Sequence, residues 1–178
     1  MIADVVATPP VRLAGLQDLG QIMALENEAF PHGWSAQSWA EEITDHYVAV
    51  AGDGLGVIAM SEVAGTAELL RVIVSPEARG HGLGRSLVSH GLEWAQHFGA
   101  AKVFLEVSAD NCAAIKLYES SGFAPVNRRA DYYGPGDDGV VYCRVIVPLD
   151  TLVLPEPGSP SPANVPTAVS KEEPCPNR

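Results

Sequence analysis

One carboxylate interrupts an apolar segment near the middle of the chain, where Glu106 stands within the run Val103 to Val107. A charged carboxylate without a partner among apolar neighbours costs several kcal/mol, so its presence needs a reason. One interpretation is a general base, because partial burial makes a carboxylate a stronger proton acceptor. The other is a structural carboxylate at a strand end that pairs with an arginine.

Asn111 and Tyr118 follow this segment and are seven residues apart. Seven residues are about two turns of an α-helix, so both side chains are expected on the same side of a short helix. The two residues add to the interpretation of Glu106 as a reacting group. Taken alone, they are better explained as a core tyrosine and an asparagine that caps the helix.

A glycine-rich turn, Arg79 to Gly84, lies between an apolar strand and a helical apolar pattern. Such a junction directs unpaired N–H groups and the positive end of a helix dipole at one point, which favours a phosphate. A Walker loop needs a lysine directly after its last glycine, where Arg85 stands, and the third glycine of a dinucleotide fingerprint would also fall at Arg85. The pattern RxxGxG therefore predicts another kind of pyrophosphate site, held by backbone amides.

Three arginines, Arg71, Arg79 and Arg85, stand near this turn with only Glu77 opposing them. We expect them to form a cationic mouth for phosphates, with solvated surface residues as the alternative. The rest of the chain is acidic, with a formal net charge of −11. A general nucleic-acid binder needs a basic face and is therefore excluded, whereas a basic partner is favoured.

Apolar alternation and helical spacing predict seven strands and four helices. Asp18 and Ser35 stand where the caps of the first two helices are expected, and a loop at 131–138 is expected to carry two tyrosines between the last two strands. Alternation places Glu106 on the opposite face of its strand from Val103, Leu105 and Val107. The expected strands are 11–14, 46–51, 57–61, 67–74, 102–107, 123–129 and 139–148, and the expected helices are 19–29, 36–44, 83–98 and 111–120.

A length of 178 residues with 47% apolar composition fits one domain, expected over residues 1–150. Seven of the 14 prolines fall in the last 24 residues, so 151–178 is expected to be a disordered Pro/Ser-rich tail. The three cysteines lack disulfide-framework or zinc-site spacing, which favours a reducing, cytoplasmic setting without a metal. Neither a secretory leader nor a membrane span is indicated.

The motifs together resemble one family. RxxGxG after the strand RVIVSP, then LEV, SADN and AAIKLYESSGF, are similar to the GNAT acetyltransferase superfamily over roughly residues 11–148. EAF with HGWS, and RR followed by YY, resemble the ribosomal-protein-alanine N-acetyltransferases of the RimI type. The resemblance implies an α/β (α+β) GNAT-like fold, with a central mixed, mostly antiparallel sheet of about seven strands flanked by about four helices.

The resemblance also implies a role for each matching residue. Glu106 would accept the proton of an attacking amine, directly or through a water, and Tyr118 would donate a proton to the departing thiolate. Backbone groups of Val72 to Val74 would hold the pantetheine arm and thioester of acetyl-CoA. The implied cofactor-binding residues are Val72, Ile73, Val74, Gly80, His81, Gly82, Leu83, Gly84, Arg85 and Asn111.

The expected reaction is acetyl transfer from acetyl-CoA to the α-amine of a protein, with the N-terminal alanine of a small-subunit ribosomal protein as the substrate that the resemblance implies. Trp34, Tyr132 and Tyr133 are expected to contact the first residues of that substrate. The alternatives are an acetyltransferase for a small amine or a protein lysine, and a non-catalytic acyl-CoA sensor. The expected partner is a basic protein N-terminus, with no nucleic acid and no membrane, and the oligomeric state stays open.

Overall fold

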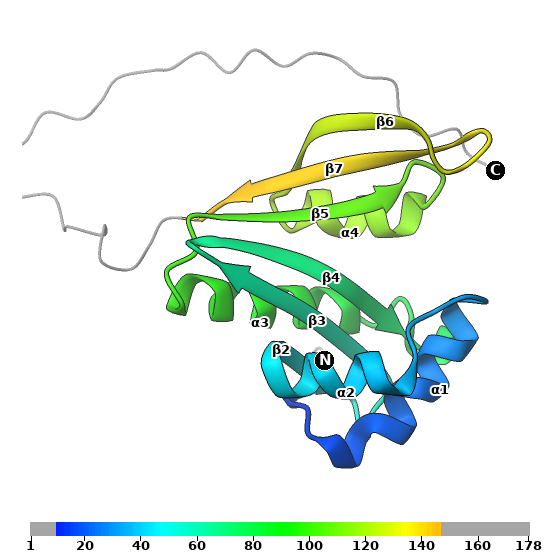
Figure 1. The fold of residues 1–178 in the computed structure, drawn as a ribbon, viewed down its shortest axis with the longest axis vertical. Helices are drawn as coiled ribbons and strands as arrows, with labels where there is room; N and C mark the ends of the chain where they lie inside the picture. Colours follow the sequence, from blue (N-terminus) through cyan, green and yellow to red (C-terminus); the bar gives the residue numbers. More distant parts are fainter. Residues whose placement is uncertain (1–9, 147–178) are drawn as a thin grey trace, which may run out of the picture.

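The computed structural model describes residues 10–146, so the domain boundary expected near residue 150 and the expected tail 151–178 lie outside the described residues. A seven-stranded sheet in the order β1-β2-β3-β4-β5-β7-β6 forms its centre (Figure 1). β4 and β5 are parallel and the other neighbouring strands are antiparallel, which confirms the predicted fold class. The strands are β1 Val11–Leu13, β2 Tyr47–Ala51, β3 Gly56–Val63, β4 Thr66–Val74, β5 Lys102–Ser108, β6 Ala124–Gly134 and β7 Asp137–Val145. The helices are α1 Leu19–Ala29, α2 Ala36–Asp45, α3 Leu83–His97 and α4 Cys112–Ser120.

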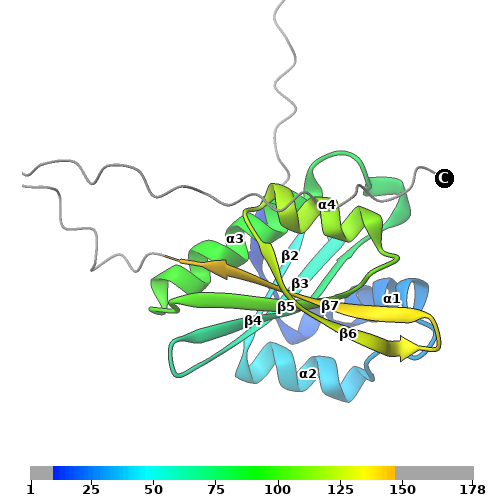
Figure 2. The ribbon, with the colours of Figure 1, turned by 90° about the horizontal axis from the view of Figure 1, so that it is seen from above.

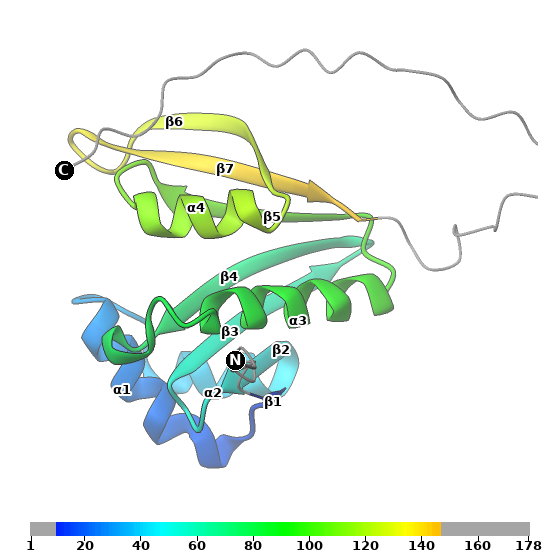
Figure 3. The same cartoon turned by 180° about the vertical axis from the view of Figure 1, so that it is seen from behind.

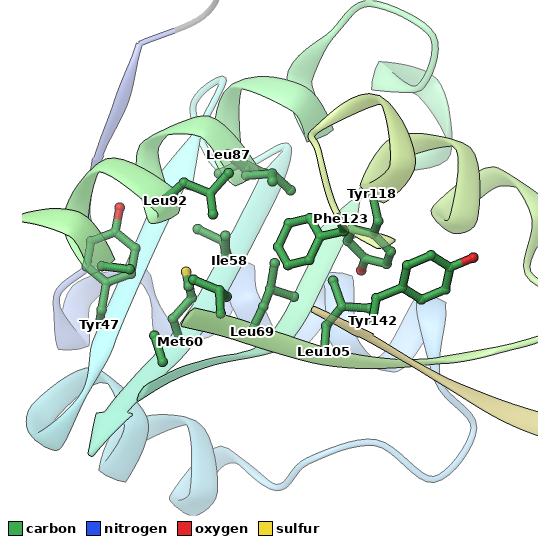
Figure 4. Close-up of a cluster of buried hydrophobic side chains, with 14 of the residues drawn as sticks. Tyr47, Ile58, Met60, Leu69, Leu87, Leu92, Leu105, Tyr118, Phe123 and Tyr142 are labelled. Atoms are coloured by element: carbon green, nitrogen blue, oxygen red, sulfur yellow. The ribbon is translucent and has the colours of Figure 1, made fainter. Parts of the chain in front are cut away.

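The helices cover both faces of the sheet, α1 and α2 on one and α3 and α4 on the other (Figure 2). Each face has its own apolar core, because the strands alternate between the two. Ile58, Leu69 and Leu105 belong to the same buried cluster as Leu87 of α3 on the second face (Figure 4). Within residues 10–146, no helix is long and apolar enough to span a bilayer.

The two central strands, β4 and β5, pair only at their beginnings, Thr66–Glu68 with Lys102–Phe104. A register shift against β3 leaves Leu70 as an extra residue in β4, and such a bulge bends and twists its strand. The second half of β4 consequently diverges from β5, and the sheet opens into two halves (Figures 1 and 3). From Leu69 to Val74, the edge of β4 that faces β5 has no strand partner.

The two predicted helix caps differ in outcome. Ser35 accepts a hydrogen bond from the backbone N–H of Ser38 at 3.0 Å, which confirms it as the cap of α2. Asp18 stands directly before α1, but its side chain does not cap that helix. Its carboxylate instead accepts hydrogen bonds from the Arg12 guanidinium and from the Gly15 backbone N–H, because a 3-10 turn leads straight into α1.

The prediction of a loop at 131–138 is wrong, because β6 continues to Gly134 and β7 begins at Asp137. The Asp138 carboxylate accepts the Asp131 backbone N–H at 2.9 Å and stabilises an irregular strand in which Asp131 has a positive φ of 55°. Tyr132 and Tyr133 therefore lie near the end of a strand, with their rings 5.0 Å apart and nearly perpendicular.

Candidate active site

A cavity of about 290 Å³ opens where β4 and β5 diverge, and we call it the acceptor cavity. It brings together Glu106 from β5, Asn111 and Tyr118 from either end of α4, and Tyr133 from β6. With Val72 of β4, five of the predicted site residues thus share one space although they come from four elements. The remaining lining residues are Phe30, Leu69, Leu70, Arg71, Val72, Val107, Ser108, Ala114 and Asp137.

Glu106 is held in place by an ion pair and a tyrosine. Its Oε1 lies 2.7 Å from Arg129 Nη1, and its side chain is 26% exposed. A hydrogen bond with Glu106 is the largest cause that raises the pKa of Tyr132, whose side chain is otherwise exposed. The arginine partner expected under the structural interpretation of Glu106 is therefore present, and the carboxylate still faces the cavity.

Tyr118 is buried, with its ring edge-on to Phe123 at 6.0 Å (Figure 4). Burial raises the pKa of Tyr118 to about 12, and the neighbouring Tyr133 adds to the shift. The phenol consequently keeps its proton at neutral pH, which is the form that a proton donor needs.

Asn111 is the helix cap that the sequence predicted, and it also lies at the acceptor cavity. Its side-chain oxygen accepts the Ala114 backbone N–H at 3.1 Å and caps α4, while the residue also lines the acceptor cavity. Asn111 and Tyr118 lie on the same side of α4, as their spacing predicted.

A second cavity, of about 750 Å³, lies at the N-terminus of α3, and we call it the phosphate cavity. Gly80 and Gly82 of its loop have φ angles of 79° and 82°, which side chains rarely adopt. No atom would meet a Cβ at either glycine within 4 Å, so the space before the loop is open. The first N–H groups of α3 have no partner within the helix and can bind a phosphate there.

Side chains add positive charge to the phosphate cavity. Arg79 and Arg85 line it, as the sequence predicted, and so does Lys116 of α4, which the sequence reasoning missed. Lys116 faces this cavity because α4 packs beside the start of α3. His81 is exposed and does not line the cavity.

The two cavities meet along β4, since both are lined by Ala114 and each by one of Val72 and Val74. Ile73 between them points into the core and can offer only its backbone. The unpaired edge of β4 supplies the N–H and C=O groups that an amide-containing arm would bind. The residues therefore fit a cofactor with a pyrophosphate at one end, an amide-rich arm and a reactive group at the other.

The expected place of Arg71 in the phosphate mouth is wrong, because this residue lines the acceptor cavity. Alternation along β4 turns Arg71 to the α1 side of the sheet, together with Ile73, whereas the glycine turn leads into α3 on the other side. Phe30 reaches the same cavity and was also missed. Trp34, predicted to contact substrate, is packed against the Arg71 guanidinium with 4.7 Å between its ring centroid and Arg71 Cζ.

Comparison with known proteins agrees with this geometry. Residues 19–123 match the acetyltransferase (GNAT) family. The chain belongs to this family. Its GNAT fold and acetyltransferase activity, which the sequence motifs implied, are thereby confirmed.

Several relatives are named for one specific activity. The [ribosomal protein bS18]-alanine N-acetyltransferase of Escherichia coli K12 is 33% identical over 126 residues, which are 68% of this chain and 84% of the relative. A putative enzyme of the same name from Bacillus subtilis is 28% identical over 138 residues, which are 74% of this GNAT protein and 91% of the relative. The crystal structure of the Escherichia coli ribosomal-protein-S18-alanine N-acetyltransferase has a TM-score of 0.71 at 27% identity, covering 78% of this chain and 94% of that one.

Proposed function

We propose that this GNAT enzyme acetylates the α-amine of a protein N-terminus, with an alanine-starting ribosomal protein as its substrate and acetyl-CoA as the acetyl donor. The observation that carries the proposal is the junction of the two cavities, with Glu106 and Tyr118 at the end away from the phosphate-binding loop. The 33% identity with the Escherichia coli enzyme supports the choice of substrate.

Each proposed role follows from where the group lies. The Glu106 carboxylate takes the proton from the acceptor amine, directly or through a water, and the Tyr118 hydroxyl donates its proton to the sulfur that leaves. A backbone N–H of Val72 to Val74 stabilises the oxyanion, an interaction of the kind worth about 2.7 to 4 kcal/mol. When bound, acetyl-CoA supplies the thioester carbon that the amine attacks.

The energetics of deprotonation favour an α-amine over a lysine. At about pH 7, producing the free amine costs about 1 to 1.4 kcal/mol for an α-amino group and roughly 4.6 kcal/mol for a lysine. The Glu106 carboxylate is paired with Arg129 and still faces the cavity, so it is placed to take this proton. A moderate base suffices for the α-amine.

The charge of the chain supports a basic substrate. The net charge is −11, and Glu106 and Asp137 both face the acceptor cavity. Complementary charge raises the rate at which two proteins meet. The ribosomal proteins that would be its substrates are basic, and the proposal places the enzyme in the cytoplasm, where these proteins are made.

A panel of acceptors tests the proposal. Peptides that differ only in their first residue are compared with an N-terminally blocked peptide that contains lysine and with small amines. The proposal expects the highest kcat/KM for alanine-starting peptides with a free α-amine. Turnover of small amines or of the blocked peptide, with none of the free alanine peptides, would favour the alternative substrates.

A non-catalytic acyl-CoA sensor is the alternative from another class. It would bind acetyl-CoA but need neither Glu106 nor Tyr118 in its cavity. Membership of the acetyltransferase (GNAT) family argues against this alternative.

A further inference from the structure

Arg71 packs against two aromatic rings at the acceptor cavity. Its guanidinium carbon lies 4.3 Å from the Phe30 ring centroid and 4.7 Å from that of Trp34. The side chain is 23% exposed and lines the cavity together with Glu106. A guanidinium that packs on rings presents its N–H groups in a fixed plane.

Glu26 of α1 is the acidic partner of this guanidinium. The carboxylate is completely buried, accepts the Trp34 backbone N–H at 2.7 Å and lies 3.5 Å from Arg71 Nη2. A Cβ at Gly33 would come within 2.4 Å of Glu26 Oε1, so the turn before Trp34 passes too close for any side chain. The cluster thus has a defined geometry that ties α1 and this turn to β4.

The cluster leaves hydrogen-bonding capacity on Arg71 unused. A guanidinium has five N–H donors, and Glu26, at 3.5 Å, is its only acidic partner within residues 10–146. Arg71 Nε and Glu26 Oε2 are buried without a hydrogen-bond partner in this part of the chain. Because Nε is buried, the donors that a ligand in the cavity could reach are those of the two terminal nitrogens, and the side chain is 23% exposed and lines this cavity.

Arg71, Glu106 and Tyr133 line the same cavity. Burial raises the pKa of Tyr133, the charge of Glu106 adds to the shift, and the charge of Arg71 opposes it. A carboxylate and a cation thus influence one tyrosine from the two strands that enclose the cavity. An acceptor that carries an amine and a nearby carbonyl matches this arrangement.

We propose that Arg71 donates a hydrogen bond to the first carbonyl oxygen of the acceptor and so selects α-amines. The inference rests on the proposed function. In a peptide, the α-amine and the first carbonyl are attached to the same carbon, so an amine at Glu106 brings its carbonyl into this small cavity. A lysine side chain or an alkyl amine has no carbonyl at this position, and loses the interaction.

A cycle of two changes tests this contact. One change is Arg71→Lys, which keeps a positive charge beside Glu26 but loses the planar donors and the ring packing. The other replaces the first peptide bond of an alanine-starting peptide by a trans-alkene, which removes the carbonyl oxygen. Arg12→Lys on β1 is the matched control, because Arg12 is exposed and pairs with Asp18 outside the cavity.

Each change alone is expected to lower kcat/KM for the acceptor by about tenfold or more, as for the loss of a hydrogen bond to a charged group. The two changes together should lower kcat/KM for the acceptor little more than either change alone. The KM for acetyl-CoA should stay unchanged. Arg12→Lys should behave as the wild type with both acceptors. When turnover of the alkene peptide is too slow, its inhibition constant against the normal peptide completes the cycle.

If the two changes together lower kcat/KM by the product of their separate effects, Arg71 and the carbonyl act independently and the proposal is overturned. The proposal is also overturned if the wild-type enzyme binds and acetylates the normal and the alkene peptide equally well. This comparison needs no variant, so it is informative even if Arg71→Lys folds poorly. Failure of the proposed function looks different, because the wild-type enzyme would then not acetylate the normal alanine peptide at all.

Discussion

Arg129 Nη1 lies 2.7 Å from Glu106 Oε1, so the proposed general base is an ion-paired carboxylate. The arginine comes from β6 and the carboxylate from β5, two strands that are separated by β7 in the sheet. The pair holds the carboxylate in one orientation at the cavity wall. The two interpretations of Glu106, as a structural partner of arginine and as a reacting group, are therefore compatible.

Glu106→Gln is expected to lower kcat by about 10²-fold to 10⁴-fold, the range of a lost general base. The amide keeps the shape of the side chain, so the KM for acetyl-CoA should be unchanged. Steady-state kinetics with an alanine peptide measure both. Glu68→Gln, at an exposed position on the same sheet, is the matched control and should retain full activity. Undiminished transfer by Glu106→Gln would remove the assigned role.

Tyr118→Phe should lower kcat by about 10²-fold or more, because it removes the proposed proton donor but keeps the ring that packs on Phe123. The pKa of Tyr118 is raised to about 12, so its protonated form persists through alkaline pH. A pH profile of the wild type should therefore show no loss of rate from this group between about pH 7 and 10. An alkaline fall in that range that Tyr118→Phe abolishes would contradict the assignment.

Gly82→Ala should weaken the binding of acetyl-CoA. The φ of Gly82 is 82°, and placing a side chain in this left-handed region costs about 1 kcal/mol or more. Calorimetric titration with coenzyme A and thermal unfolding measure the two effects. Gly20→Ala is the control, since nothing lies within 4 Å of its Cβ position on the exposed side of α1. It should gain up to about 1 kcal/mol of stability and bind normally.

Asp18→Asn should lower the free energy of unfolding at neutral pH by about 1 kcal/mol, a value reduced by the solvent exposure of Arg12. The Arg12 hydrogen bond, followed by the Gly15 N–H, lowers the pKa of Asp18 from 3.8 to about 2. A lowered pKa contributes stability above the unfolded value, which is lost as the pH falls through the folded value. Denaturant unfolding should show the difference between wild type and variant shrinking from about pH 4 to 2. A difference that is constant over this range would exclude the pair as its cause.

The sequence could predict what depends on local periodicity. The period of two placed Glu106 opposite Val103, Leu105 and Val107, and these three side chains are buried while Glu106 faces the cavity. The seven-residue spacing placed Asn111 and Tyr118 on one side of α4. The seven strands and four helices followed from the same patterns.

The features of the fold and the site that the sequence did not predict depend on contacts between residues that are far apart in the chain. The partner of Glu26 is Arg71, on a different element, and no local pattern links them. The β6 segment that carries Tyr132 and Tyr133 contains residues typical of turns, but Asp138 of the next strand stabilises it as an irregular strand. The bulge at Leu70, which separates β4 from β5, likewise arises from pairing with β3.

The most direct test of the proposed activity is mass spectrometry of a basic, alanine-starting ribosomal peptide after incubation with this protein and acetyl-CoA. The peptide should gain the mass of one acetyl group, with fragmentation placing it on the α-amine, and should gain none with Glu106→Gln on the same timescale. An unmodified α-amine, or an acetyl group found only on lysine side chains, would contradict it.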